Sequence, residues 1–332
     1  MIISRTPLRM SFVGGGSDLP VFYREEPGAV LSTAIDKFVY VSVNSKFGGG
    51  IRLAYSQTEE VDRLDQIQHR LFRAAFETLG IEGGVEVTTT ADIPSRGTGL
   101  GSSSTFTVGL LKVMSAYSGR DLPAGRLAQL ACEVEIERCG EPIGKQDQYA
   151  AAFGGMNLFE FMPDDTVRVS PVIMKPEIRD RLEDELLVFY TGKTRTASSI
   201  LVAQSQAVAD DASARRALRR MVELTYQMRD DLSAGRADAV GAILDEGWSL
   251  KKTLSQGISD PDIDAWYEAA MRAGASGGKL LGAGAGGFLL FLAPPDRHEE
   301  IACAVRLPRM KVGFSAEGSK IVYYNPSDGA LT

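Results

Sequence analysis

Apolar and polar positions follow two different periods along the chain, and each period predicts a kind of element. Residues 2–4, 10–13 and 29–43 are rich in apolar and β-branched side chains, which is typical of strands. Apolar residues at three- and four-residue spacing predict a helix over 61–79 that ends at Gly80, with His69 on its solvated face. The first part of the chain is therefore expected to mix strands with helices.

The rest of the chain continues this mixture. Residues 85–91 and 184–190 have strand-like composition, and helical spacing recurs at 105–117, 126–138, 197–233, 237–255 and 263–273. Because the strands and helices do not alternate strictly, the expected fold class is α+β rather than a doubly wound parallel sheet. The composition turns polar near 163–165, and we expect an N-terminal domain over 1–180 and a C-terminal domain over 181–332.

Composition narrows the classes of function. A formal net charge of −7 leaves no basic surplus for a nucleic-acid backbone, so nucleic acid is not an expected partner. The 3 cysteines and 2 histidines lack zinc-site spacing, and an odd number of thiols favours a reducing compartment. Without a signal-peptide pattern or an apolar run of about 20 residues, the chain is expected to be cytoplasmic, with no membrane partner.

A glycine- and serine-rich segment at residues 94–104 lies between a predicted strand and a predicted helix. Glycines permit close backbone approach and a helix N-terminus offers N–H donors, which together bind phosphate. A serine-capped helix after a turn is the alternative, but three successive hydroxyls favour a phosphate site. The residues expected to contact a nucleotide are Pro94, Gly97, Gly99, Leu100, Gly101, Ser102, Ser103 and Ser104.

Two other glycine segments imitate nucleotide motifs. Residues 192–194 match the end of a Walker A loop, but Leu187 stands where that loop requires glycine. Residues 282–287 match the dinucleotide pattern, but the strand-like run 288–293 follows where a helix is required. Neither a P-loop nor a Rossmann site is therefore expected.

Three motifs in order, at residues 7–18, 94–104 and 279–287, resemble those of the GHMP kinases, the superfamily that includes galactokinase, homoserine kinase, mevalonate kinase and phosphomevalonate kinase. The resemblance implies ATP-dependent phosphorylation of a small molecule. It also implies two lobes, an N-terminal lobe with a left-handed βαβ crossover and a ferredoxin-like C-terminal lobe, with the active site in their cleft. Mg²⁺ would accompany ATP, and a homodimer is left open.

The first motif, Pro-Leu-Arg-Met-Ser-Phe-Val-Gly-Gly-Gly-Ser-Asp, implies the acceptor site. Asp18 would accept hydrogen bonds from sugar hydroxyls, and Arg9 would lie near the reacting oxygen and the transferring phosphoryl group. Gly15 and Gly16 replace an acidic residue and a histidine of galactokinases, so the motif is more similar to the D-glycero-D-manno-heptose 7-phosphate kinases and, remotely, to fucokinases. The residues expected to contact the substrate are Arg9, Ser11, Gly14, Gly15, Gly16, Ser17, Asp18, Asp147, Lys193, Arg195 and Gly284.

The resemblance also assigns catalytic roles. Asp147 is the expected base for the attacking hydroxyl, and Ser103 and Glu137 are the expected Mg²⁺ ligands, with Glu133 as the alternative acid. Lys193 and Arg195 follow a strand among hydroxyl residues and could hold a phosphate already on the substrate; the alternative is that both are simply solvated.

The resulting hypothesis is phosphorylation of the anomeric hydroxyl of heptose 7-phosphate to the 1,7-bisphosphate for nucleotide-sugar synthesis. A fucose- or galactose-type kinase of free sugars is the first alternative. A catalytically silent protein of the same fold is the second, and the intact set of Arg9, Asp18, Ser103 and Asp147 argues against it.

Overall fold

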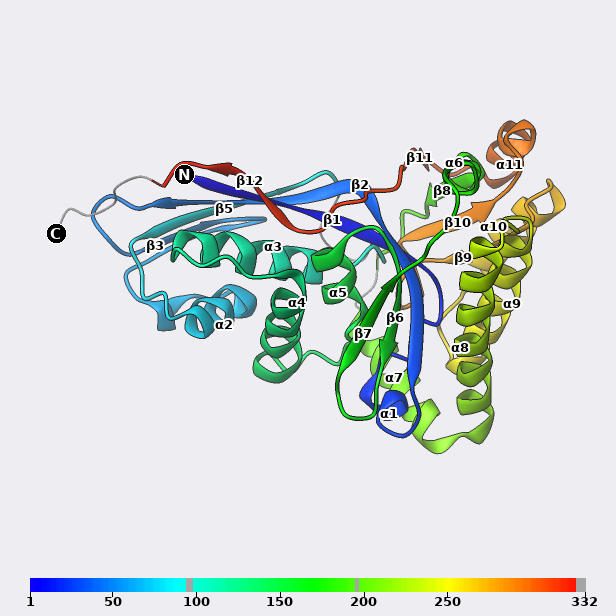
Figure 1. Cartoon of the computed structure of the whole chain (residues 1–332), viewed down its shortest axis with the longest axis horizontal. Coiled ribbons are helices and arrows are strands. Elements are labelled where there is room, and N and C mark those ends of the chain that lie inside the picture. The colour runs from blue at the N-terminus through cyan, green and yellow to red at the C-terminus, as the bar shows by residue number, and fades with distance from the viewer. Residues whose placement is uncertain (94–97, 195–196, 327–332) are drawn as a thin grey trace.

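The structure is a computed structural model that describes residues 1–93, 98–194 and 197–326. Within these residues two sheets form, one at each end of the molecule in Figure 1. The eight-stranded sheet has the order β12-β1-β2-β5-β3-β4, with β6 and β7 added through β2. Its strands are β1 (Ile2–Val13), β2 (Gly28–Ser45), β3 (Ile51–Ala54), β4 (Thr58–Val61), β5 (Val85–Ala91), β6 (Met156–Phe161), β7 (Val167–Pro171) and β12 (Lys320–Tyr324).

The second sheet is antiparallel, with the order β11-β8-β10-β9 in the described residues. Its strands are β8 (Leu186–Tyr190), β9 (Gly277–Leu280), β10 (Phe288–Leu292) and β11 (Arg309–Met310). Both α+β composition and the two-lobed arrangement are therefore as expected. The division at residue 180 stays a prediction. Near its C-terminal end the chain returns to the first sheet, where β12 pairs with β1.

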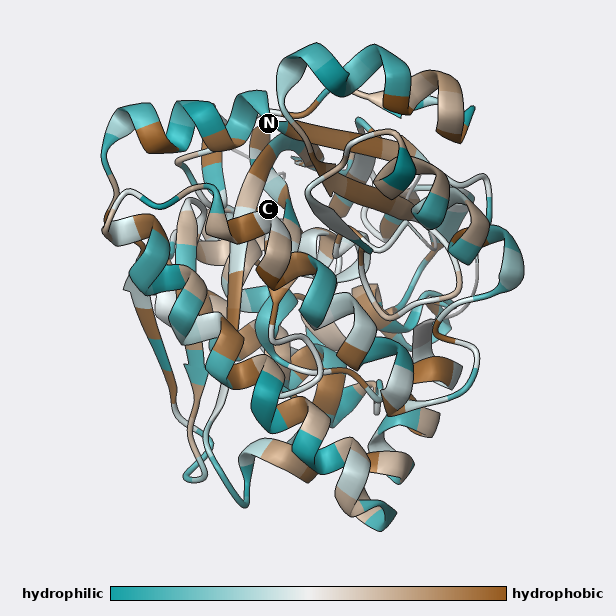
Figure 2. Ribbon diagram, turned by 90° about the vertical axis from the view of Figure 1, so that its right-hand side faces the viewer, coloured by the Kyte–Doolittle hydropathy of each residue, from teal (hydrophilic) through white to brown (hydrophobic). Residues whose placement is uncertain are grey.

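Helices cover the two sheets. The earlier helices are α1 (Pro20–Tyr23), α2 (Arg70–Leu79), α3 (Ser102–Tyr117), α4 (Ala124–Cys132) and α5 (Gln146–Phe153), and a π-helix, η2 (Glu133–Arg138), continues α4. The later helices are α6 (Pro176–Asp184), α7 (Ala197–Asp210), α8 (Ala212–Ser233), α9 (Ala239–Leu254), α10 (Pro261–Arg272) and α11 (His298–Val305). Brown and teal residues alternate along many of the helical ribbons in Figure 2, as amphipathic helices require. No helix in the described ranges is long and apolar enough to cross a membrane.

The strand β1 and the helix α3 form the centre of the first lobe. Nearly every residue of β1 is buried, and α3 crosses β1 and β2 with its own buried face. The close approach requires Gly109, because a Cβ there would lie 2.9 Å from the Thr6 hydroxyl. The pairing of β1 with β2 is irregular between Pro7 and Arg9, just where β1 enters the cleft described below.

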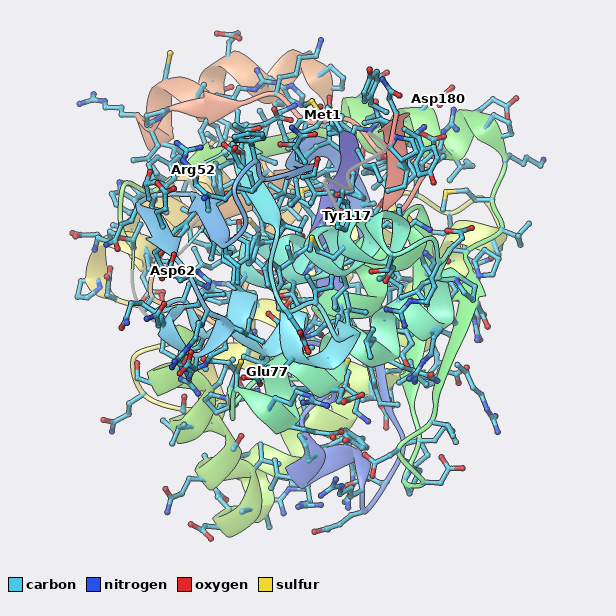
Figure 3. The ribbon with its side chains drawn as sticks, turned by 90° about the vertical axis from the view of Figure 1, so that its left-hand side faces the viewer. Met1, Arg52, Asp62, Glu77, Tyr117 and Asp180 are labelled. Atoms are coloured by element: carbon cyan, nitrogen blue, oxygen red, sulfur yellow. The ribbon has the colours of Figure 1, made fainter. Side chains whose placement is uncertain are left out.

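The helix predicted over 61–79 is wrong in its first half. Residues 58–61 pair with β3 as β4, a 3₁₀ turn, η1 (Leu64–Gln66), follows, and α2 begins only at Arg70. Apolar spacing alone did not reveal this turn, in which the Gln66 side chain accepts backbone hydrogen bonds from Asp62 and Arg63. Figure 3 faces this end of the molecule, with Arg52 on β3, Asp62 after β4 and Glu77 on α2 labelled.

The helix predicted over 197–233 is divided into α7 and α8. Asp211 interrupts it with extended backbone and caps α8, its carboxylate accepting the backbone N–H of Ser213 at 2.7 Å. The break allows α7 to lie against α1 and the cleft while α8 packs along α9.

Candidate active site

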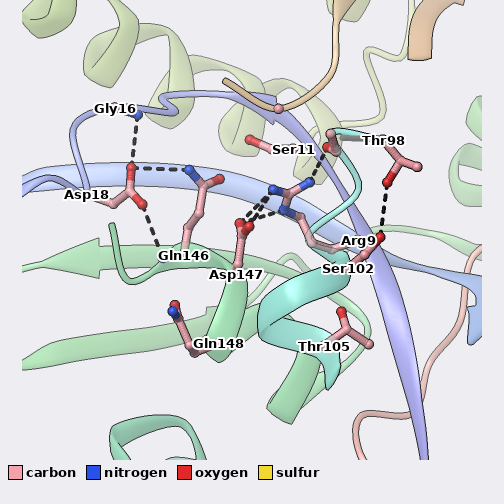
Figure 4. Close-up of polar contacts among 12 residues, drawn as sticks. Arg9, Ser11, Gly16, Asp18, Thr98, Ser102, Thr105, Gln146, Asp147 and Gln148 are labelled. Carbon is pink, nitrogen blue, oxygen red and sulfur yellow. Dashed lines mark hydrogen bonds and ion pairs between the residues drawn. The ribbon is translucent and has the colours of Figure 1, made fainter. Parts of the chain in front are cut away.

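A cleft of about 1000 Å³ brings together segments that are far apart in the sequence. Its walls come from the end of β1 and the loop after it, the start of α3, residues 135–147, α7, α9 and the turn after β9. The three motifs singled out in the sequence therefore meet at one place. Figure 4 shows the polar residues at its centre.

The N-terminus of α3 forms one wall. Gly101 is its N-cap with a φ of 75°, and the serines that follow, Ser102, Ser103 and Ser104, line the cleft. The Ser102 hydroxyl is hydrogen-bonded to that of Thr98 at 3.0 Å. A helix start with exposed N–H groups and hydroxyls is a favourable place for a phosphate.

The third glycine motif supports this wall from behind. A Cβ on Gly99 would lie 2.3 Å from the carbonyl oxygen of Leu281, and one on Gly287 would lie 2.3 Å from that of Thr98. The backbone at residues 98–99 therefore packs directly against the backbone of the third glycine motif, and no side chain would fit between them. Gly284, expected at the substrate, does not line the cleft; its backbone packs against Ile258.

Leu100, expected at the nucleotide, is fully buried outside the lining of the cleft, and its carbonyl oxygen accepts the backbone N–H of Arg9 at 3.1 Å. Its contribution is therefore to fasten the loop to β1. Pro94 and Gly97 lie outside the described residues.

Arg9 and Asp147 form a bidentate ion pair in the cleft. The Arg9 Nε and Nη2 donate to the two carboxylate oxygens of Asp147, each at 2.7 Å, and Nη1 donates to the Gly99 carbonyl oxygen at 2.7 Å (Figure 4). Arg9 is only 4% exposed. The pair lies directly beside the start of α3, because a Cβ on Gly101 would be 3.3 Å from Asp147.

Asp18 lies deeper in the same cleft. Its carboxylate accepts the backbone N–H of Gly16 at 2.9 Å and the side-chain amide of Gln146 at 3.1 Å (Figure 4). Burial raises the pKa of Asp18, and the nearby charge of Asp147 raises it further, whereas the Gly16 hydrogen bond lowers it. Gln146 therefore fixes the orientation of an acid that faces the cleft.

The remaining residues of the first motif divide into two groups. Ser11, Gly15 and Gly16, three of the predicted substrate contacts, line the cleft. Gly14 and Ser17 do not: the Ser17 hydroxyl donates to the Gly14 carbonyl oxygen at 2.8 Å and closes the loop. These two residues shape the acceptor loop from outside the cleft.

The acidic residue beside Ser103 is Glu135, which the sequence analysis did not single out. It is 1% exposed, and its carboxylate accepts hydrogen bonds from Gln148 at 2.5 Å, Thr107 at 3.1 Å and Ser103 at 3.4 Å. Burial raises the pKa of Glu135 to about 7, with the Ser104 hydrogen bond acting in the opposite direction.

Glu137 and Glu133, the two expected acids, are outside the lining of the cleft. Glu137 is exposed, and Glu133 accepts hydrogen bonds from Arg138. The prediction chose the wrong side of the helix, because residues four apart share a face and the residue midway between them points away from it. The position nearest Ser103 therefore belongs to Glu135.

Lys193, expected to hold a substrate phosphate, is already paired. Its Nζ lies 2.6 Å from Asp260 and 2.7 Å from Asp262, and the residue is not part of the cleft lining. Arg195 lies outside the described residues.

Two other lysines line the cleft instead. Lys251, on α9, and Lys279, on β9, are each 5% exposed. Burial lowers the pKa of Lys251 to about 8 and that of Lys279 well below its usual value.

At the far end of the cleft an aromatic group surrounds His69. Its ring lies 4.8 Å from that of Tyr55, 5.1 Å from Phe72 and 5.8 Å from Phe106, measured between centroids. The expectation of a solvated surface histidine is therefore wrong. His69, Tyr55 and Phe106 all line the cleft, which gives it an aromatic wall.

Comparison with known proteins agrees with this geometry. Residues 67–155 match the N-terminal domain model of GHMP kinases, and residues 228–308 match the C-terminal model. A D-glycero-alpha-D-manno-heptose 7-phosphate kinase of Campylobacter jejuni is 30% identical, over 96% of this chain and 98% of that protein.

Two further relatives extend the comparison. A bifunctional fucokinase/GDP-fucose pyrophosphorylase of Arabidopsis thaliana is also 30% identical, but this chain covers only 29% of its length. A solved D-glycero-D-manno-heptose 1-phosphate kinase of Bacteroides thetaiotaomicron has a TM-score of 0.81 at 27% identity, covering 98% of this chain and 100% of that one. A Methanococcus jannaschii mevalonate kinase, at 20% identity and a TM-score of 0.72 over 94% and 98% of the two chains, shares the fold.

Proposed function

The chain belongs to the GHMP kinases, and from that premise we propose that it transfers a phosphoryl group from ATP to the anomeric hydroxyl of D-glycero-D-manno-heptose 7-phosphate. The product is the 1,7-bisphosphate, a precursor for nucleotide-sugar synthesis. The observation that carries the proposal is the pairing of Arg9 with Asp147 beside the N-terminus of α3, since it puts a carboxylate and a cation where an acceptor and a phosphate would meet. The Campylobacter jejuni relative supports the choice of acceptor.

ATP would occupy the cleft along its length. Its phosphates fit the start of α3, where Ser102, Ser103 and the helix N–H groups are available. Its base would fit against the aromatic wall of Tyr55, His69 and Phe106, because aromatic side chains favour stacking with a flat heterocycle.

The residues present fit a Mg²⁺ ion. Ser103 and Glu135 would hold it, since Mg²⁺ bound with a nucleotide typically takes one or two carboxylates together with phosphate oxygens and water. In the described residues no cluster of three or more acidic, histidine or cysteine ligands exists that would bind a metal alone. When bound, Mg²⁺ would neutralise charge on the phosphate oxygens.

Asp147 would receive the proton of the anomeric hydroxyl while the oxygen attacks the phosphorus in line. Arg9 would hold the Asp147 carboxylate in place through two hydrogen bonds and stabilise the charge of the transferring group. Asp18, oriented by Gln146, would accept hydrogen bonds from other sugar hydroxyls.

A coupled assay of ADP release over a panel of acceptors tests the proposal. The panel contains heptose 7-phosphate, the free heptose, L-fucose and galactose, at saturating ATP and Mg²⁺. We expect the highest kcat/KM with heptose 7-phosphate. A higher kcat/KM with fucose or galactose would show that the acceptor is that free sugar and not heptose 7-phosphate. ATP binding without transfer to any sugar would indicate a catalytically silent member of the family.

A further inference from the structure

Lys251 is a buried cation in the cleft that forms no ion pair within the described residues, although Asp18 and Asp147 favour its charge. Its Nζ donates to the Gly282 carbonyl oxygen at 2.9 Å. Lys279 differs, because its Nζ donates to the carbonyl oxygens of both Ser11 and Phe12, at 2.8 and 3.0 Å. Burying a charge without a partner is costly, so an ammonium group kept in such a place is suited to an anion that arrives with a ligand.

Three donors lie around the position that a Cβ on Gly15 would occupy. An ideal Cβ on Gly15 would lie 3.5 Å from the side-chain nitrogen of Gln146, 3.7 Å from the Ser11 hydroxyl and 3.8 Å from the Lys251 Nζ. All four residues line the cleft. An amide, a hydroxyl and an ammonium group therefore converge on a space that a side chain at position 15 would fill.

Gly15 lies in a turn, but its own conformation does not require glycine, so the lack of a side chain there keeps that space open. Gly14 and Gly16 have φ of 92° and 107°, in the left-handed region, whereas Gly15 has an ordinary φ that any residue adopts. Since the backbone does not require glycine at position 15, the absence of a side chain has a consequence only for what enters the cleft.

We propose that Lys251, together with Ser11 and Gln146, binds a phosphate monoester that the acceptor sugar already carries, in the space over Gly15. The inference rests on the proposed function, because it names the group by which that acceptor is recognised. It moves the phosphate contact from Lys193, which follows β8 and is paired with two aspartates, to a lysine on α9. A compact ammonium group is a common phosphate partner.

The first test measures binding by calorimetry without nucleotide, so that it does not depend on turnover. The probes are heptose 7-phosphate and the free heptose, with mannose 6-phosphate and mannose as a second pair. We expect Lys251→Met to weaken binding of the phosphorylated sugars by about 30-fold or more, and that of the free sugars by less than about threefold. Lys252→Met, on the exposed side of the same helix and 3.4 Å from Asp264, is the matched control and should change neither.

Gly15→Ala provides a second variant whose folding is not in question. The methyl group would have only ordinary van der Waals contacts, and the backbone conformation suits alanine. We expect it to weaken the binding of both phosphorylated sugars by about tenfold while the free sugars keep their affinity. Equal losses on phosphorylated and free sugars, in either variant, would overturn the subsite.

The second test separates the two sources of phosphate in the cleft. If Lys251→Met raises the KM for ATP and leaves sugar-phosphate binding unchanged, the lysine serves the nucleotide and the proposal is wrong. If the wild-type protein binds sugar phosphates tightly but phosphorylates none of them, the proposed function is wrong and the proposed phosphate subsite still stands. If it phosphorylates free and phosphorylated sugars equally well, the proposed phosphate subsite is wrong and the assignment as a sugar kinase still stands.

Discussion

The two ends of the cleft are built in different ways. The phosphate end consists mainly of one continuous segment, residues 98–104, whose glycines and helix N–H groups offer backbone chemistry. The acceptor end is assembled from side chains on separate elements: Asp18 after β1, Gln146 at the start of α5 and Lys251 on α9. The difference indicates a division of labour, because a backbone cradle suits any triphosphate whereas side chains placed from several elements select one acceptor.

Replacing Asp147, which lies where the two ends meet, should have the largest effect. Asp147→Asn removes the proposed base and keeps the size of the side chain, so kcat with heptose 7-phosphate should fall by about 10²- to 10⁴-fold. The affinity for ATP should stay within about threefold, because the phosphate end does not depend on this carboxylate. Steady-state kinetics and ATP titration measure the two quantities. Near-normal kcat would remove Asp147 from its role as base and reduce it to a partner of Arg9.

A change at Glu135 should weaken the phosphate end alone. Glu135→Gln keeps the shape but not the charge beside Ser103, and the Mg²⁺ concentration for half-maximal activity should rise by roughly 10- to 100-fold. Glu137→Gln, on the exposed side of the π-helix, is the matched control and should leave it unchanged. Activity assays over a magnesium titration compare the two. The opposite order of effects would restore Glu137 as the ligand.

The sequence predicted the phosphate end better than the acceptor end for a physical reason. A phosphate cradle is local, so glycines, serines and a helix start within one segment already describe it. Glu135 was missed because its neighbours Glu133 and Glu137 share the other face of the helix, and a helix phase cannot be assigned reliably from a segment with acids on both sides.

Lys251 was missed for a different reason. Adjacent lysines at 251 and 252 are typical of a solvated helix face, and lysine is rarely buried. Only the tertiary packing of the helix buries Lys251 in the cleft and leaves Lys252 exposed. The ion pairs of Lys193 could not be predicted either, since its partners Asp260 and Asp262 are about 70 residues away and no local pattern links them.

The acceptor end should respond to pH above 8, where Glu135 at the phosphate end, whose pKa is about 7, is already ionised. Burial lowers the pKa of Lys251 to about 8, so the side chain is charged below this pH and neutral above it. Arg9, Asp18, Asp147 and Lys279 act on its charge, Asp18 favouring it and Arg9 opposing it. We therefore expect kcat/KM for heptose 7-phosphate to fall above pH 8, approaching tenfold per pH unit.

The profile of Lys251→Met is the control for this prediction. Its kcat/KM should be lower at pH 7 and should lose the decline that begins near pH 8, so the ratio of wild type to variant decreases with rising pH. The free heptose, assayed with wild type, should show no such decline. A wild-type profile for the phosphorylated acceptor that stays flat to pH 9.5 would mean that the charge of Lys251 does not contribute to its recognition.

The smallest effect is expected at Lys193. Its Nζ is paired with Asp260 and Asp262, and Lys193 is not part of the cleft lining. Asp260 also caps α10 through the backbone N–H groups of Asp262 and Ile263, at 3.0 Å each. Lys193→Met removes a part-exposed ion pair but leaves this cap, so kcat/KM for heptose 7-phosphate should change by less than about threefold. Measuring it beside Lys251→Met, with the same acceptor and its free sugar, compares the two candidate lysines directly. If Lys193→Met lowers kcat/KM more than tenfold for the phosphorylated sugar alone, the phosphate contact is at Lys193. The acceptor end, like the phosphate end, would then have been predictable from a local sequence pattern.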